Sequence, residues 1–251
     1  MSTIFDLTGK VAIVTGANTG IGQAIALSLA AAGADIAAVG RTPAEETVEK
    51  VRALGRKAEI VSADLSSIEP VQRVVDETIE KLGGLDILIN NAGIIRRADS
   101  VDFTEEDWDA VIDTNLKSTF FLAQAAGRHM LAQGSGKIVN IASLLSFQGG
   151  IRVPSYTASK SGVAGLTKLL ANEWAARGVN VNAIAPGYIA TNNTAALQAD
   201  ETRNRQIQER IPAGRWGDPS DIGGAAVFLA SPAANYIHGH VLAVDGGWLA
   251  R

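Results

Sequence analysis

A serine, a tyrosine and a lysine stand close together in the stretch Ser143 to Lys160, which reads SLLSFQGGIRVPSYTASK. The lysine follows Tyr156 by four residues, so on a helix the two side chains lie on one face. An ammonium beside a phenol lowers the phenol pKa from about 10, which makes Tyr156 a candidate proton donor and acceptor near neutral pH. Ser143 ends an apolar run and could bond the same reacting oxygen. Because this spacing also occurs by chance, the rest of the chain must support the interpretation.

Short apolar runs alternate with helical patterns along the whole chain. The runs, each expected to be a strand, are 10–14, 35–39, 58–62, 85–89, 137–142, 179–184 and 240–244. The helical patterns are 23–32, 43–54, 68–82, 105–132, 154–177, 191–210 and 219–229. This alternation predicts an α/β fold, a parallel sheet covered by helices on both faces. We find no linker or repeat, so residues 1–251 are expected to form a single domain.

The elements also predict where the chemistry lies. Pro154 and Ser155 mark the start of the helix that carries Tyr156, because proline suits a first turn and serine can cap it. In a sheet of this kind the ligand binds past the carboxyl ends of the strands, where the strand order reverses. Every polar motif of interest follows a predicted strand directly, which places these motifs at one edge of the sheet.

Composition excludes several classes of function. The formal charge of -4 offers no basic stripe, so nucleic acid is not expected as a partner. The chain has no cysteine and only three histidines, which are not clustered, so we expect neither a disulfide nor a metal site. Residues 1–10 lack the features of a signal peptide. The longest apolar stretch, 24–40, is interrupted by Gly33 and Asp35, so we expect no membrane span and a soluble, cytoplasmic protein.

The segment Thr15 to Gly22, TGANTGIG, lies between the first predicted strand and the first helix. Glycines let a pyrophosphate approach the backbone, and a helix N-terminus favours its negative charge. The spacing G-x-x-x-G-x-G is a variant of the dinucleotide-binding pattern, and no Gly-Lys-Ser/Thr follows it as in a nucleotide-triphosphate loop. A glycine-rich turn without a ligand is the alternative.

Three other polar positions are ambiguous on their own. Asp64 follows the third strand and could accept a hydrogen bond from an adenine amino group, or could cap a helix. Asn91, in the turn NNAG, could tie neighbouring loops together or contact a ribose. Asn115 lies within a helical pattern, where asparagine is a mediocre helix former, and could simply face solvent.

Taken together, TGANTGIG, NNAG, Asn115, Ser143, Tyr156-x-x-x-Lys160 and Pro186-Gly187 resemble the motifs of the short-chain dehydrogenase/reductase family. Their order and spacing match along nearly the whole chain. The resemblance implies a Rossmann-type doubly wound fold, a nicotinamide cofactor and a homotetramer. It makes an inactive, nucleotide-sensing relative improbable. A serine hydrolase is disfavoured, since no G-x-S-x-G segment is present.

The resemblance also implies roles for individual residues. Tyr156 is the general acid and base, Ser143 polarises the substrate oxygen, and Lys160 lowers the tyrosine pKa and holds the nicotinamide ribose. Asn115 supports a water that relays protons to Lys160. The implied cofactor contacts are Gly16, Asn18, Thr19, Gly20, Ile21, Gly22, Arg41, Asp64, Leu65, Asn91, Ala92, Gly93, Tyr156, Lys160, Pro186, Gly187, Ile189 and Thr191.

The choice between NAD(H) and NADP(H) stays open. A carboxylate after the second strand would bind the ribose 2′-hydroxyl of NAD and repel the 2′-phosphate of NADP. Residues 39–42 read VGRT, without a carboxylate, and Arg41 could pair with a 2′-phosphate or be an ordinary surface residue. Charge therefore favours NADP(H), whereas the subgroup discussed next favours NAD(H).

Four further stretches, GIIRR, SLLSFQGGIRVPSYTASK, NAIAPGYIATNNT and IPAGRWG, resemble one subgroup of the family. That subgroup acts on 2-dehydro-3-deoxy-D-gluconate or 2-deoxy-D-gluconate, on the route from pectin-derived uronates. A sugar acid carries a carboxylate, which a guanidinium group matches well. The expected substrate contacts, beside Ser143 and Tyr156, are Arg96, Arg97 or Arg152 for the carboxylate and Gln148, Asn192 and Asn193 for hydroxyl groups, although each arginine could simply be on the surface.

Two segments are expected to move against or face the substrate. Residues 188–212 are expected to act as a lid and 147–153 as the substrate-facing loop, although an exposed helix would explain the lid's polar composition equally well. Trp248 and Leu249 are candidates for a subunit interface, or could cover their own sheet. The rival activities with the same chemistry are 3-ketoacyl-carrier-protein reductase and gluconate 5-dehydrogenase.

Overall fold

Seven parallel strands form one sheet in the computed structural model, which describes residues 4–251. The strands are β1 (Val11–Thr15), β2 (Asp35–Gly40), β3 (Ala58–Ser62), β4 (Ile87–Asn90), β5 (Gly136–Ile141), β6 (Val179–Pro186) and β7 (Val241–Val244). Their order is β3-β2-β1-β4-β5-β6-β7, so the winding direction reverses between β1 and β4. The predicted Rossmann-type, doubly wound sheet is confirmed, and the expected ligand site lies at this reversal.

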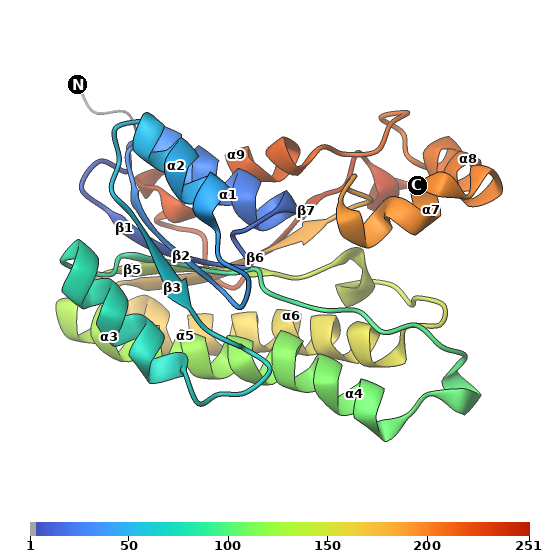
Figure 1. Cartoon of the computed structure of the whole chain (residues 1–251), viewed down its shortest axis with the longest axis horizontal. Coiled ribbons are helices and arrows are strands. Elements are labelled where there is room, and N and C mark those ends of the chain that lie inside the picture. The colour runs from blue at the N-terminus through green and yellow to red at the C-terminus, as the bar shows by residue number, and fades with distance from the viewer. Residues whose placement is uncertain (1–3) are drawn as a thin grey trace.

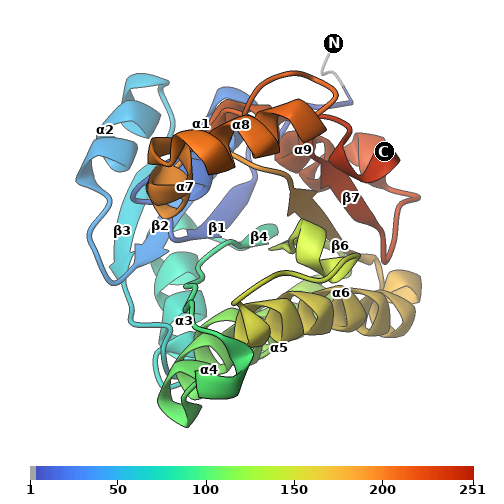
Figure 2. The same ribbon diagram turned by 90° about the vertical axis from the view of Figure 1, so that its right-hand side faces the viewer.

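Helices cover both faces of the sheet (Figure 1). One face carries α1 (Gly20–Ala31), α2 (Glu45–Ala53) and α9 (Pro219–Ala230). The other face carries α3 (Val71–Leu82), α4 (Glu105–Ile112), α5 (Ser118–Gln133) and α6 (Pro154–Trp174). The short helices α7 (Ala195–Ala199) and α8 (Glu201–Arg210) lie apart from both layers, at the end of the molecule that faces the viewer in Figure 2.

Short helical turns connect several of these elements. The 3-10 turns are η1 (Ser100–Asp102), η3 (Leu144–Ser146), η4 (Ala175–Arg177), η5 (Asn192–Thr194), η6 (Pro232–Ala234) and η7 (Trp248–Ala250), and η2 (Asp113–Lys117) is a π-helical turn between α4 and α5. Within residues 4–251 no helix is long and apolar enough to cross a membrane. Residues 1–3 of the segment considered for a signal peptide lie outside the described residues.

Alternating side chains of each strand enter two separate cores. In β1, Ala12 and Val14 pack in the layer beneath α1 and α9, whereas Val11 and Ile13 pack in the layer beneath α3 and α5. Successive strand side chains point to opposite faces, and a sheet covered on both faces needs apolar residues on each. This is why the predicted strands are continuous apolar runs.

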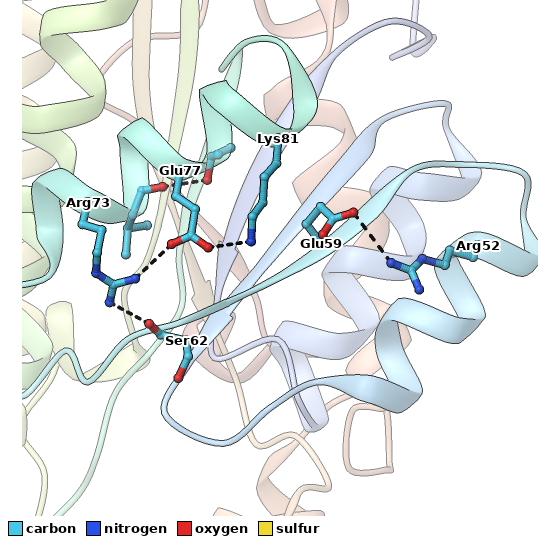
Figure 3. Close-up of polar contacts among 8 residues, drawn as sticks. Arg52, Glu59, Ser62, Arg73, Glu77 and Lys81 are labelled. Atoms are coloured by element: carbon cyan, nitrogen blue, oxygen red, sulfur yellow. Dashed lines mark hydrogen bonds and ion pairs between the residues drawn. The ribbon is translucent and has the colours of Figure 1, made fainter.

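Side chains from two helices hold the edge strand β3 (Figure 3). The Arg73 guanidinium donates a hydrogen bond of 2.8 Å to the carbonyl of Ser62 and lies 3.0 Å from the Glu77 carboxylate. On the other side, Arg52 lies 3.7 Å from Glu59. Charged residues along an edge strand discourage pairing with another chain. Arg73 also fixes the end of β3, two residues before the predicted adenine-binding aspartate.

The prediction that Ser155 caps α6 is wrong. Val153 occupies the cap position, and Pro154 is the first helical residue. Ser155 therefore lies inside the first turn, where its hydroxyl is buried and has no hydrogen-bond partner among the described residues. Proline at the first position still begins the helix, since its missing N–H costs nothing there.

Candidate active site

Ser143, Tyr156 and Lys160 come together where β5 ends beside α6. Lys160 is buried, and its Nζ donates a hydrogen bond of 2.6 Å to the carbonyl of Ile141, the last residue of β5. The same nitrogen lies 5.6 Å from the centre of the Tyr156 ring. The Ser143 hydroxyl accepts a hydrogen bond of 3.2 Å from the Leu145 amide and is close enough to Tyr156 to lower the pKa of that phenol. The structure therefore brings the three predicted side chains together at the end of β5.

Two serine hydroxyls fasten the turn after Ser143 to the same helix. Ser146 donates to the carbonyl of Lys160 at 2.7 Å, and Ser161 donates to the carbonyl of Leu145 at 3.1 Å. Hydrogen bonds on consecutive residues of α6 limit how far η3 can slide along the helix. The distance between the serine and tyrosine hydroxyls is thereby held by the backbone.

The pKa of Tyr156 is raised in this structure, so the prediction that this pKa is lowered is wrong. Burial raises this pKa, and the Ser143 hydrogen bond and the positive charge of Arg97 only partly oppose the increase. The Lys160 ammonium is directed at a backbone carbonyl, and burial lowers its own pKa to about 8. The tyrosine is therefore protonated at neutral pH in the protein alone.

Asn115 is buried, with 1% of its surface exposed, so the solvent-facing alternative is wrong. It lies in the π-helical turn η2, and its side-chain oxygen accepts from the Ile94 amide at 2.8 Å. Its side-chain nitrogen donates to the Ile94 carbonyl at 2.9 Å. The Asn115 side-chain amide thus makes the same pair of hydrogen bonds to the Ile94 backbone that a neighbouring strand would make, and it ties η2 to the loop after β4. Such π turns are frequent at functional sites.

A chain of buried amides and hydroxyls extends from this asparagine through the sheet. The Thr119 hydroxyl donates to the Asn115 carbonyl at 2.9 Å. The Asn90 side chain donates to the Thr119 carbonyl at 3.4 Å and to the Asn140 side chain at 2.9 Å. The Asn140 side chain in turn donates to the Thr167 hydroxyl at 3.0 Å. Satisfied buried networks of this kind stiffen a core. Sequence reasoning missed Asn140 and Thr167; the signal was an asparagine inside the apolar run KIVNIAS.

The turn after β1 has the shape that a pyrophosphate requires. Gly16 and Gly20 have positive φ angles of 64° and 57°. A Cβ at Gly16 would lie 2.9 Å from the Asn91 side-chain nitrogen, and one at Gly22 would overlap the Gly16 carbonyl. Asn91 in turn donates to the carbonyl of Thr15 at 2.9 Å, so it does tie the loops after β1 and β4 together. Only glycine fits this turn.

The N-terminus of α1 also fits an anionic ligand. Thr19 occupies the cap position without a side-chain capping bond, and the first turn holds no acidic residue. The first amide N–H groups of the helix are therefore not satisfied by side chains, and the helix dipole favours negative charge there. Together with the glycine geometry, this is what a dinucleotide pyrophosphate needs.

The two residues predicted at the adenosine end face each other. Arg41 follows β2, its side chain is 79% exposed, and it lies 3.9 Å from the carboxylate of Asp64. Asp64 accepts a hydrogen bond of 2.9 Å from the Ser66 amide, which lowers the pKa of Asp64. It caps a turn and not a helix, because α3 begins only at Val71. Arg41, predicted to meet a 2′-phosphate, therefore lies beside a carboxylate on the exposed surface after β2.

The remaining predicted cofactor residues lie on the loops that follow the central strands. Asn18, Ile21, Leu65, Ala92 and Gly93 follow β1, β3 and β4, while Pro186 ends β6 and is followed by Gly187, Ile189 and Thr191. A Cβ at Gly20 would lie 3.5 Å from the Thr191 methyl group. The segment after β6 therefore approaches the glycine turn after β1, although the two are far apart in sequence.

Two of the three candidate arginines form ion pairs with carboxylates of the chain. Arg96 lies 3.1 Å from Asp107, in the first turn of α4, and Arg152 lies 3.0 Å from Asp99. Arg152 also has a positive φ of 64°, which is unusual for a residue other than glycine. These pairs fasten the loop after β4 to α4 and to the loop before α6.

Arg97 differs from its neighbours. No carboxylate among residues 4–251 pairs with it, and its charge acts on Tyr156. Its Nη2 lies 3.5 Å from the carbonyl of Asn193, which, like Asn192, belongs to η5 at the start of the predicted lid. Arg97 is thus in contact with the start of the predicted lid, and its charge lowers the pKa of Tyr156.

Trp248 folds back onto its own chain. It is 5% exposed and packs with Tyr188, Ile207 and Ile211. Its indole nitrogen donates to the Gln148 side chain at 3.3 Å. The tryptophan therefore packs on the predicted lid and on the substrate loop. The sequence predicted instead that it forms a subunit interface or covers its own sheet.

Comparison with known proteins places this geometry in a family. A family model described as "Enoyl-(Acyl carrier protein) reductase" matches residues 16–249. The chain is 59% identical over 248 residues to the 2-dehydro-3-deoxy-D-gluconate 5-dehydrogenase of Escherichia coli, covering 98% of each chain. It is 58% identical to the enzyme of that name from Bacillus subtilis, covering 98% of this chain and 97% of the relative.

Solved structures agree over the whole length. A protein of Agrobacterium tumefaciens with bound NADP, provisionally identified as a 2-deoxy-D-gluconate 3-dehydrogenase, has a TM-score of 0.92 at 61% identity and covers 99% and 100% of the two chains. A gluconate 5-dehydrogenase of Burkholderia cenocepacia, in complex with NADP and tartrate, has a TM-score of 0.94 at 40% identity over 98% of each chain. The chain therefore belongs to the short-chain dehydrogenase/reductase family, whose members are oxidoreductases that act on CH–OH groups with NAD(P).

Proposed function

We propose that this enzyme transfers a hydride between a nicotinamide cofactor and a secondary alcohol or ketone of a deoxy sugar acid, of the 2-dehydro-3-deoxy-D-gluconate or 2-deoxy-D-gluconate type. The observation that carries the proposal is Arg97, which forms no ion pair with a carboxylate among residues 4–251, donates to the carbonyl of Asn193 at 3.5 Å and lowers the pKa of Tyr156 by its charge. The names of the relatives at 58% and 59% identity supply the same substrate class.

The chain's own groups divide the proton chemistry. A nicotinamide cofactor, when bound, supplies or takes up the hydride. In oxidation Tyr156 removes the hydroxyl proton of the substrate, and in reduction it returns a proton to the new alkoxide. The Ser143 hydroxyl, close to the tyrosine, holds the same substrate oxygen. Lys160 holds the cofactor ribose, and Asn115 supports the water that relays protons.

The cofactor proposal is NADP(H), with NAD(H) as the alternative that the subgroup resemblance favours. Arg41 is exposed after β2, and no carboxylate stands at residues 40–42 to repel a 2′-phosphate. The related structures from Agrobacterium tumefaciens and Burkholderia cenocepacia contain NADP.

The larger organisation is proposed on family grounds. Residues 1–251 act as one dinucleotide-binding and catalytic domain, and residues 188–212, which include η5, α7 and α8, form its lid. The enzyme is a cytoplasmic homotetramer that serves the breakdown of pectin-derived uronates.

A panel of ketones assayed with NADPH and NADH tests the function. We expect the highest kcat/KM with the ketones formed by oxidising deoxy sugar acids, such as 2,5-diketo-3-deoxygluconate. The guanidinium of Arg97 should favour any of the acids over the thioester, because it can pair with a carboxylate. Two ketones serve as comparisons. 5-Ketogluconate keeps the hydroxyl group that the deoxy acids have lost, and a 3-ketoacyl thioester lacks the carboxylate. A thioester or 5-ketogluconate reduced tenfold faster than any deoxy acid would contradict the proposal. The ratio of kcat/KM measured with NADPH to that measured with NADH tests the cofactor proposal.

The substitution Arg97→Ala tests the substrate-binding role. A hydrogen bond to a charged group contributes about 1.5–3 kcal/mol, so KM for the acid substrate should rise about 10- to 100-fold. Arg96→Ala is the matched control, because Arg96 lies one residue away and is paired with Asp107. Equal effects of the two substitutions, or an unchanged KM in Arg97→Ala, would show that Arg97 does not bind the carboxylate.

The pH dependence follows from the raised pKa of Tyr156. Oxidation needs the ionised tyrosine, which is the minor form at neutral pH, so kcat/KM for oxidation should rise with pH into the alkaline range. Reduction needs the protonated form, so its kcat/KM should stay level at neutral pH and fall only when the tyrosine ionises. Steady-state rates from pH 6 to 10 in both directions check this. An oxidation rate that falls between pH 7 and 9 would refute it.

A further inference from the structure

The indole of Trp248 contacts three segments of the candidate site at once. Its nitrogen donates to the Gln148 side chain, in the substrate-facing loop, at 3.3 Å. Its ring centre lies 4.7 Å from that of Tyr188, just after β6. The guanidinium of Arg210, the last residue of α8, lies 4.0 Å over the same ring.

The backbone that carries this indole is held firmly. The Asp245 carboxylate accepts hydrogen bonds from the Gly247 amide at 2.8 Å and from the Leu249 amide at 2.9 Å. Gly247 has a φ of 90°, and a Cβ there would lie 3.0 Å from Pro212, just after α8. The turn after β7 therefore fits closely against the end of the lid.

The hydrogen bond fixes the orientation of the Gln148 amide. An indole nitrogen is a donor only, so the group that faces it must be the side-chain oxygen of the glutamine. The amide nitrogen is then directed away from the indole. No residue from 4 to 251 accepts a hydrogen bond from it. Gln148 thus offers two unused donors from the loop between Ser143 and Tyr156.

The same packing connects the loop with the lid. Leu144, next to the catalytic serine, shares one apolar cluster with Trp248 and with Ile207 of α8. Arg251 adds a hydrogen bond of 3.0 Å to the carbonyl of Glu209. Movement of α8 therefore has to carry the indole with it or break its contacts.

We infer that Trp248 is a positioning residue, which fixes Gln148 as a donor to an oxygen of the sugar acid and joins the substrate loop to the lid helix α8. The inference rests on the proposed function for the identity of the substrate. Trp248 itself touches no reacting atom. Its effect should therefore appear in KM far more than in kcat.

The substitution Trp248→Phe keeps an aromatic ring against Tyr188 and Arg210 but removes the N–H group. We expect KM for the sugar acid to rise about tenfold, the value of one hydrogen bond of about 1.4 kcal/mol, with kcat and the Kd of NADPH within twofold of wild type. Gln148→Leu should raise KM similarly, and the double variant should add little to either, because both remove one interaction.

Trp216→Phe is the matched control. Trp216 lies in the same apolar cluster and contacts Tyr188, but its indole nitrogen donates to Asn204 of α8 at 2.7 Å and not to the substrate loop. Its KM should stay within twofold of wild type. Equal changes in both tryptophan variants, or an unchanged KM in Trp248→Phe and Gln148→Leu, would overturn the inference.

The proposed function and the inference can fail separately. If the wild-type enzyme reduces deoxy sugar acids but the Trp248→Phe and Gln148→Leu variants keep the wild-type KM, only the inference fails. If the panel selects another ketone, the proposed function fails, and an unchanged KM for that ketone in both variants overturns the inference as well. A KM change that is confined to the Trp248–Gln148 pair supports the inference with either substrate.

Discussion

The hydrogen bond from the Lys160 ammonium to the carbonyl of Ile141 is the contact on which the site depends. It joins α6 to the end of β5, and these two elements carry the tyrosine and the serine. Burying an ammonium without a carboxylate is costly, which is why the pKa of Lys160 falls to about 8. A single carbonyl and the tyrosine ring are the partners that the described structure offers it. The position of this charge thus helps to fix Tyr156, the proposed acid and base, relative to the end of β5.

The tyrosine is surrounded by a buried hydrogen-bonded network on one side and by loops on the other. The buried chain from Asn115 to Thr167 holds the loop after β4 in place through the sheet. Arg97 and Gln148, which we propose bind the substrate, lie on loops, and each contacts the predicted lid or a residue packed on it. The proposed acid–base residues therefore lie on α6 and just after β5, whereas the residues proposed to bind the substrate lie on loops. This arrangement is common in α/β enzymes.

The alternation of apolar runs and helical patterns predicted the order of the strands and of most helices along the chain, because period and length are local properties. It did not separate α4 from α5, which the expected helix 105–132 combined, or η5, α7 and α8 within 191–210. The spacing of Tyr156 and Lys160 likewise predicted a shared helix face. The burial of Asn115 and the raised pKa of Tyr156 depend on residues distant in sequence, so no local pattern indicated them. Trp248 and Gln148 are 100 residues apart, and only the folded chain shows that they meet.

Turnover by a Tyr156→Phe variant tests the central claim most directly. Removing the proton donor while keeping the ring should lower kcat about 10²- to 10⁴-fold, with the Kd of NADPH, measured by fluorescence titration, within twofold of wild type. Tyr236→Phe is the control, because Tyr236 is 99% exposed. A Tyr156→Phe enzyme that retains a tenth or more of wild-type turnover would contradict the assignment of Tyr156 as the acid and base.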